Sequence, residues 1–134
     1  MSDALRDESR RTALVVSGGG CRGAFAVGAI EVLRERGITF DLVSGTSTGG
    51  LIAPLVAIDR VDRLRQIYTE TRTKDVLRTN LMGFFRKALF DSAPLRKLID
   101  DQIEDLDMLR LLYESACRVF ICTVNLQKGR TEYW

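Results

Sequence analysis

Short apolar runs that end at glycines alternate with longer stretches of helical periodicity in the first half of the chain. The run Ala13–Val16 is apolar and β-rich and stops at a glycine cluster, which predicts a buried strand. Residues 22–37 place apolar side chains at helical spacing and end in glycine, which predicts a helix. A second strand is predicted over 38–45 and an apolar helix over 47–58, in which Pro54 should kink the helix or delay its regular part.

The second half of the chain repeats these signals less regularly. Amphipathic helices are predicted over 60–72 and 92–103, the latter with Ser92 as its N-cap, and a strand is predicted over 118–124. A polar turn and the start of another strand follow. Because strands and helices alternate across short loops in the opening half, we expect an α/β fold with a mostly parallel sheet flanked by helices.

The composition of the chain excludes several classes of protein. Its 134 residues carry a net charge of +2 and are 46% hydrophobic and 28% charged, which fits one globular domain and gives no support for nucleic-acid binding. The polar arm over 1–12 lacks the apolar stretch of a secretory signal, and no segment is apolar enough to span a bilayer, so we expect a cytoplasmic protein. The domain over 13–134 stops within a strand-like aromatic run, so we expect it to be incomplete at its C-terminus. The three cysteines lack disulfide or metal-ligand spacing, and we expect no metal site.

The chain contains no histidine. A Ser-His-Asp triad needs an imidazole to take the proton of the serine near neutral pH. Any serine chemistry in this chain must therefore use another base.

A serine nevertheless stands between glycines, directly after a predicted strand and before a predicted helix. The G-x-S-x-G pattern is formed by Gly45, Thr46, Ser47, Thr48 and Gly49. A sharp turn at this place presents the hydroxyl at the carboxyl end of the sheet, and the glycines remove Cβ atoms that would clash there. The pattern also fits a plain strand-to-helix turn in which Ser47 is only an N-cap.

A second glycine-rich loop joins the first strand to the first helix. Its candidate site residues are Gly18, Gly19, Gly20, Arg22 and Gly23. Loops at the carboxyl ends of neighbouring parallel strands share one crevice, so we expect the backbone amides of this loop to face the Ser47 hydroxyl as an oxyanion hole. Arg22 either adds positive charge at the start of the helix or is a solvated helix residue.

These two motifs, in this order, resemble those of the patatin-like phospholipase family over about residues 13–57. The resemblance implies a three-layer α/β/α fold, Ser47 as the nucleophile of a Ser-Asp dyad, and the loop of Gly18 to Gly20, Arg22 and Gly23 as the oxyanion loop. It also implies hydrolysis of phospholipids or related lipid esters through an acyl-enzyme, without metal or cofactor.

The aspartate of the dyad has no evident counterpart in this chain. The family carries it in a D-G-A or D-G-G motif, which is absent here. Asp41 precedes Ser47 by six positions, roughly 20 Å along a strand, and so belongs at the opposite end of the sheet. We expect solvated surface charge at the aspartates in or beside the predicted helices, which are Asp91, Asp100, Asp101, Asp105 and Asp107. We therefore interpret the chain as the N-terminal part of such an enzyme, inactive or nearly so alone.

Two other interpretations of the glycine-rich loop stay open. Gly18, Gly20 and Gly23 also satisfy the G-x-G-x-x-G pattern of dinucleotide-binding proteins. That pattern expects an acidic residue at the end of the second strand, whereas Asp41 stands near its beginning. A catalytically dead domain that serves in protein interaction is the other alternative.

A basic stretch over 71–97 contains seven basic and two acidic side chains. Apolar residues, among them Phe84 and Phe85, are interspersed with these charges. One hypothesis is a peripheral membrane contact or acyl-chain entrance beside the active site. The other is an amphipathic helix that packs on the sheet while its basic side chains extend into solvent.

Overall fold

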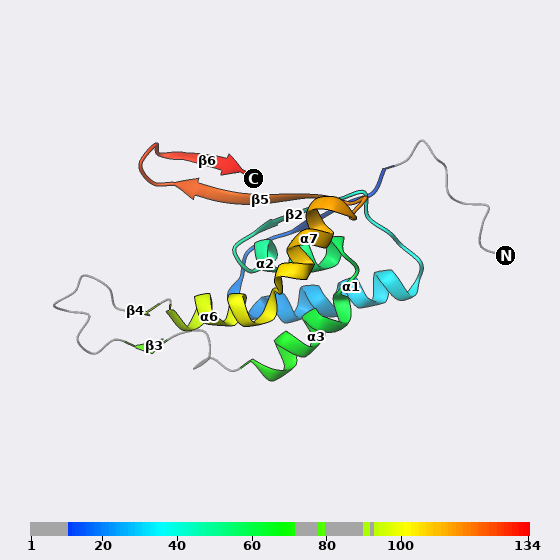
Figure 1. Cartoon of the computed structure of the whole chain (residues 1–134), viewed down its shortest axis with the longest axis horizontal. Helices are drawn as coiled ribbons and strands as arrows, with labels where there is room; N and C mark the ends of the chain where they lie inside the picture. Colours follow the sequence, from blue (N-terminus) through cyan, green and yellow to red (C-terminus); the bar gives the residue numbers. More distant parts are fainter. Residues whose placement is uncertain (1–10, 72–77, 80–89, 92) are drawn as a thin grey trace.

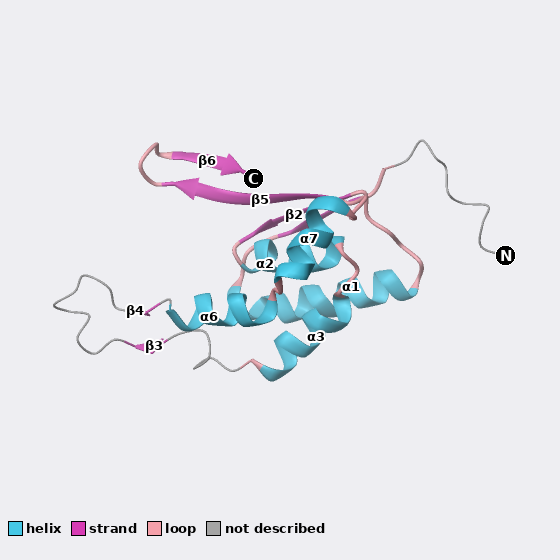
Figure 2. Ribbon diagram, viewed as in Figure 1, coloured by secondary structure: helices cyan, strands magenta, loops and turns pink. Residues whose placement is uncertain are grey.

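The computed structural model describes residues 11–71, 78–79, 90–91 and 93–134. A four-stranded sheet lies above the helices in Figure 1, and Figure 2 shows these helices on one side of it. The elements are β1 (Ala13–Val16), α1 (Gly23–Glu35), β2 (Leu42–Thr46), α2 (Thr48–Ala57), α3 (Val61–Glu70), β3 (Arg78–Thr79), β4 (Phe90–Asp91), α6 (Ala93–Gln102), α7 (Asp105–Tyr113), β5 (Arg118–Asn125) and β6 (Arg130–Tyr133).

The four-stranded sheet is mostly parallel. Its strand order is β1-β2-β5-β6, with β1, β2 and β5 parallel and β6 antiparallel to β5. Val16 at the end of β1 is in register with Gly45 near the end of β2, so the loops that follow the two strands leave the sheet at the same rim. The α/β fold class expected from the sequence is confirmed.

Helix α2 forms the centre of the core, between the sheet and helices α1 and α3. It packs on β2 and β5, and its apolar residues are buried around most of its circumference. Such a helix gains most of its stability from packing. The core consists of Val16, Val27, Ile30, Val43, Ile52, Ala53, Leu55, Val56, Val61 and Leu64.

Pro54 lies inside α2, whose regular part begins at Thr48. Of the two outcomes expected of Pro54, a delay of the regular part is therefore wrong, and a kink stays a prediction. A proline removes one hydrogen bond and crowds the carbonyl of the residue four positions earlier, which is Gly50. Because Pro54 and its neighbours are buried, packing of α2 on the sheet outweighs that local cost.

The opposite face of the sheet carries exposed apolar side chains. Val15, Phe120, Val124 and Tyr133 project from β1, β5 and β6 and are all exposed. Alternation along each strand sends their neighbours, such as Val16, towards the helices. No described helix covers this face.

The remaining predicted elements lie close to their expected places. The helices over 60–72 and 92–103 appear as α3 and α6, while the strand over 38–45 is shorter and begins only at Leu42. Ser92 lies outside the described residues, as do Phe84, Phe85 and most of the basic stretch. Within the described part of the chain, no helix has both the length and the apolar character needed to cross a bilayer.

Candidate functional site

Ser47 occupies the single residue between the end of β2 and the start of α2. Its backbone has φ 55° and ψ −122°, and the residue is exposed. Positive φ is unfavourable for a residue with a side chain, and such a conformation persists only where the surrounding structure enforces it. The tight turn therefore presents the Ser47 hydroxyl to solvent at the carboxyl rim of the sheet.

Two glycines permit this turn by close approach of backbone to backbone. A Cβ at Gly45 would overlap the carbonyl of Gly49, and a Cβ at Gly49 would overlap the carbonyl of Val16. The first turn of α2 is thus pressed against the ends of both β1 and β2. This close approach is the physical reason for the glycines on either side of the serine.

The glycine-rich loop after β1 lies directly beside Ser47. A Cβ built on Gly18 would be 3.1 Å from the Cβ and 3.8 Å from the Oγ of Ser47. The structure therefore brings together the two loops that the sequence analysis singled out. Thr46 and Thr48, the other residues of the G-x-S-x-G turn, are exposed and buried, respectively.

Some amides of the glycine-rich loop are already used within it. Residues Gly20–Arg22 form a 3-10 turn, in which the Arg22 amide donates to the Gly19 carbonyl at 3.2 Å. The Gly23 amide donates to the carbonyls of Gly20 and Cys21. The amides of Arg22 and Gly23 are therefore hydrogen-bonded within the turn, and Arg22 is exposed at the start of α1.

Ser47 stands at the N-cap position of α2 but does not cap the helix with its side chain. The structure has no capping hydrogen bond from its hydroxyl, whereas its backbone carbonyl accepts the Gly50 amide at 2.9 Å. The interpretation of Ser47 as only an N-cap requires a hydrogen bond from its side chain to the helix, and the structure has no such bond. The hydroxyl is thus not committed to the helix.

Thr48 and Tyr68 form a polar contact beneath the turn. The Thr48 Oγ1 and the Tyr68 hydroxyl are hydrogen-bonded, and Tyr68 reaches this place from α3. Burial raises the pKa of Tyr68 above its ordinary value of 10.0, and the hydrogen bond to Thr48 acts in the opposite direction.

We expect Tyr68 to make the protein less stable in alkali. The unfolded chain releases the phenolic proton near pH 10 and the folded chain releases it at higher pH, so the folded state binds more protons in that window. The free energy of unfolding should consequently fall as the pH rises above about 10. Urea unfolding between pH 8 and 11 should show a shallower decline for Tyr68→Phe; equal slopes would contradict this prediction.

The described aspartates that form hydrogen bonds or ion pairs form them with groups other than Ser47. Asp41 lies one residue before β2, and its Oδ2 accepts the Thr12 amide at 2.7 Å, which places it at the amino end of the sheet as expected. That position gives a dinucleotide ribose no carboxylate at the carboxyl end of β2. Asp101 is exposed and bonded to Lys97.

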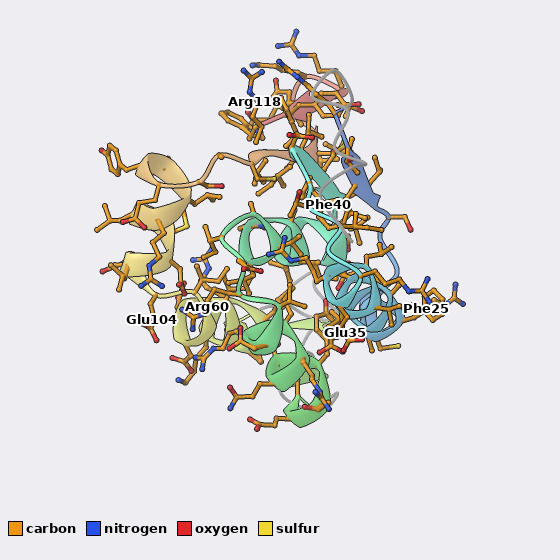
Figure 3. All side chains as sticks on the ribbon, turned by 90° about the vertical axis from the view of Figure 1, so that its right-hand side faces the viewer. Phe25, Glu35, Phe40, Arg60, Glu104 and Arg118 are labelled. Carbon is orange, nitrogen blue, oxygen red and sulfur yellow. The ribbon has the colours of Figure 1, made fainter. Side chains whose placement is uncertain are left out.

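Asp107 corrects one expectation from the sequence. It was expected to be solvated, but it is only 4% exposed and accepts a hydrogen bond from Arg60 at 3.2 Å. It also accepts the Glu104 amide at 3.4 Å and completes a capping box at the start of α7. Figure 3 shows Arg60 and Glu104 on adjoining elements. Glutamate at the N-cap and aspartate three positions later depart from the usual capping-box sequence, so this helix start has no clear signal in the sequence.

An open groove begins at the glycine-rich loop and follows the edge of the sheet. It runs between β1 and α1 and is lined mainly by apolar residues, among them Leu14, Phe25, Ala26 and Leu33. Gly18, which adjoins Ser47, and Arg22 also line it. Figure 3 shows Phe25 on the outer side of α1.

Comparisons with known proteins identify phospholipases and a lysophospholipase as relatives of this chain. Patatin-like phospholipase domain-containing protein 6 of human is 37% identical over 103 residues, which cover 70% of this chain and 8% of that protein. The cGAMP-activated phospholipase of Vibrio cholerae is 28% identical over 144 residues, covering 90% of this chain and 40% of that protein. Lysophospholipase nte1 of Aspergillus oryzae is 48% identical over 50 residues, covering 37% of this chain and 3% of that protein. The chain thus spans less than half the length of each of these relatives.

The family model for patatin-like phospholipases matches residues 14–131. This match includes the glycine-rich loop, the serine turn, β2, β5, all of β1 except Ala13 and the first half of β6. On this evidence the chain belongs to the patatin-like phospholipase family.

Proposed function

We propose that this chain carries the nucleophile and the oxyanion hole of a serine lipid acyl hydrolase. The observation that carries the proposal is the approach of Gly18 to Ser47, whose backbone is held at positive φ on the carboxyl rim of the sheet. A serine in that position combines an accessible hydroxyl with backbone amides from a neighbouring loop. The family membership and the phospholipases and lysophospholipase among the relatives support the same reaction class.

In the proposed reaction the Ser47 hydroxyl attacks the carbonyl carbon of an ester. The Oγ–C bond forms as a base takes the hydroxyl proton, and the carbonyl oxygen becomes an oxyanion. The amides of Gly18, Gly19 and Gly20 are assigned to this oxyanion, because those of Arg22 and Gly23 are used within the loop. The ester bond then breaks, the alcohol leaves with the proton, and water hydrolyses the acyl-enzyme.

The base is assigned to an aspartate, as in a Ser-Asp dyad. Among the described residues, no hydrogen bond joins an aspartate to Ser47, and Asp41, Asp101 and Asp107 have other partners. The proposal therefore places the base outside the described residues. The oxyanion hole alone favours attack on a strongly activated reagent, so reaction with such a reagent tests the nucleophile without that base.

The proposed substrates are phospholipids or other lipid esters. The apolar groove that Gly18 and Arg22 also line suits an acyl chain whose ester lies at Ser47. Peripheral contact with a membrane from the cytoplasmic side is part of the same proposal, since such substrates reside in bilayers. No metal or cofactor is assigned to the reaction.

A fluorophosphonate probe tests the proposal directly. We expect one covalent adduct per chain, located at Ser47 by peptide mass spectrometry, and complete loss of that adduct in Ser47→Ala. Ser44→Ala is the matched control, because Ser44 lies three residues earlier in β2 and is not part of the turn. We expect this variant to be labelled like the wild type.

Two outcomes would contradict the proposal. Labelling that persists in Ser47→Ala would assign the reaction to another residue. A folded wild-type chain without labelling would favour an interaction domain, and saturable NAD binding by that chain would favour the dinucleotide interpretation.

A further inference from the structure

Beneath the serine turn, three separate segments meet at one pair of hydroxyl groups. Thr48 follows Ser47 and is only 8% exposed, and its Oγ1 is hydrogen-bonded to the half-buried hydroxyl of Tyr68. Tyr68 belongs to α3, twenty positions further along the chain. The contact therefore joins the first residue of α2 to α3.

The same pair of hydroxyls abuts the end of the glycine-rich loop. A Cβ at Gly23 would be 2.6 Å from the Tyr68 hydroxyl oxygen and 2.7 Å from the Thr48 Oγ1. Gly23 is buried and begins α1. Any side chain at this position would push the two hydroxyls away, so the loop and the turn share one contact.

The hydroxyl of Tyr68 is not explained by packing alone. The ring lies against the core together with Ile67, and a phenylalanine would fill the same space. Burying a hydroxyl costs free energy unless it is hydrogen-bonded, and here its partner is Thr48. This points to a function of the hydroxyl at the turn.

We propose that Tyr68 is a positioning residue for the proposed reaction and acts through Thr48. Thr48 is joined to Ser47 by a peptide bond, so holding its side chain restrains the strained backbone of Ser47. Because the same hydroxyl pair touches Gly23, it also fixes the spacing between Ser47 and the amides of Gly18 to Gly20. Small displacements at a reacting centre can reduce its rate by two orders of magnitude. This inference rests on the proposed function.

Labelling kinetics test the inference. The fluorophosphonate reaction is resolved into the reagent concentration at half-saturation and the rate of the chemical step. We expect Tyr68→Phe and Thr48→Val each to slow the chemical step about tenfold with half-saturation unchanged, since position rather than binding is altered. The double variant should be no slower than either single variant, because both remove the same hydrogen bond.

Two further variants separate positioning from general damage. Thr48→Ser keeps the hydroxyl and should retain most of the wild-type rate. Tyr113→Phe removes a hydroxyl from an exposed tyrosine of α7 and should have no effect. An unchanged chemical step in Tyr68→Phe, or a loss in Thr48→Ser as large as in Thr48→Val, would overturn the inference.

A second measurement distinguishes failure of this inference from failure of the proposed function. In Ser47→Cys, the pH dependence of iodoacetamide alkylation, followed on the peptide that contains position 47, gives the pKa of the introduced thiol. Proximity to the N-terminus of α2 and to the loop amides should lower that pKa. We expect Tyr68→Phe in this background to raise it again. An unchanged thiol pKa in Tyr68→Phe would overturn the positioning role. This measurement does not need a reactive serine, so an unreactive wild-type serine would contradict only the proposed function.

Discussion

Replacing Gly49 with alanine is expected to lower the free energy of unfolding by about 3 kcal/mol, because the new methyl group has no room. A Cβ at this position would overlap the backbone carbonyl of Val16, and backbone at the end of a sheet strand cannot move aside as a flexible side chain can. Relief of the overlap requires α2 to separate from β1. The same movement would shift Ser47 away from Gly18.

Urea unfolding followed by circular dichroism measures this effect, with Gly28→Ala as the matched control. Gly28 lies within α1, and a Cβ there would meet no atom within 4 Å. Alanine is the better helix former, so this control should gain about 0.5–1 kcal/mol. A Gly49→Ala variant as stable as the wild type would show that the serine turn is not pressed against β1 as described.

Replacing Asp107 with alanine is expected to lower the free energy of unfolding by about 2 kcal/mol. The substitution removes the carboxylate that receives Arg60 and that accepts the Glu104 amide at the start of α7. Loss of a helix cap costs about 1 kcal/mol, and loss of a charge-assisted hydrogen bond at a buried site adds a similar amount.

Asp101→Ala is the matched control for this prediction. Asp101 and Lys97 form a shorter contact of 2.6 Å, but their side chains are 53% and 75% exposed. Solvent-exposed ion pairs contribute little, so the urea midpoint of this control should stay at the wild-type value. If Asp107→Ala unfolds at the same urea concentration as Asp101→Ala, burial does not strengthen the Asp107 contacts.

The opening half of the fold could be predicted from the sequence because its signals are local. β1 is Ala13–Val16 as predicted, and α1 ends at Glu35, two residues before Gly37, which has the positive φ typical of a glycine after a helix. The helix α7 was not predicted. Its N-cap is Glu104, which is not a usual capping residue, so the start of this helix has no clear signal in the sequence.

The candidate site could be predicted only in part, for a physical reason. Glycines around a serine at a strand-to-helix junction indicate a turn, and register in a parallel sheet brings the two loops to one rim. The contact between Thr48 and Tyr68 depends on how α3 packs, and the amphipathic pattern over 60–72 does not indicate what the Tyr68 hydroxyl contacts. Likewise, the burial of Asp107 depends on Arg60, a residue distant in sequence.

The strand order of the main sheet also affects how the chain folds. The pairing of β1 with β2 joins Ala13 to Leu42, whereas the pairing of β2 with β5 joins Leu42 to Arg118. The second two residues are more than twice as far apart in the sequence as the first two. The entropy of closing a loop grows with the logarithm of its length, which adds about 1 kcal/mol to the second pairing. The chain can thus assemble β1, α1, β2 and α2, with both glycine-rich turns, before β5 docks and completes the sheet.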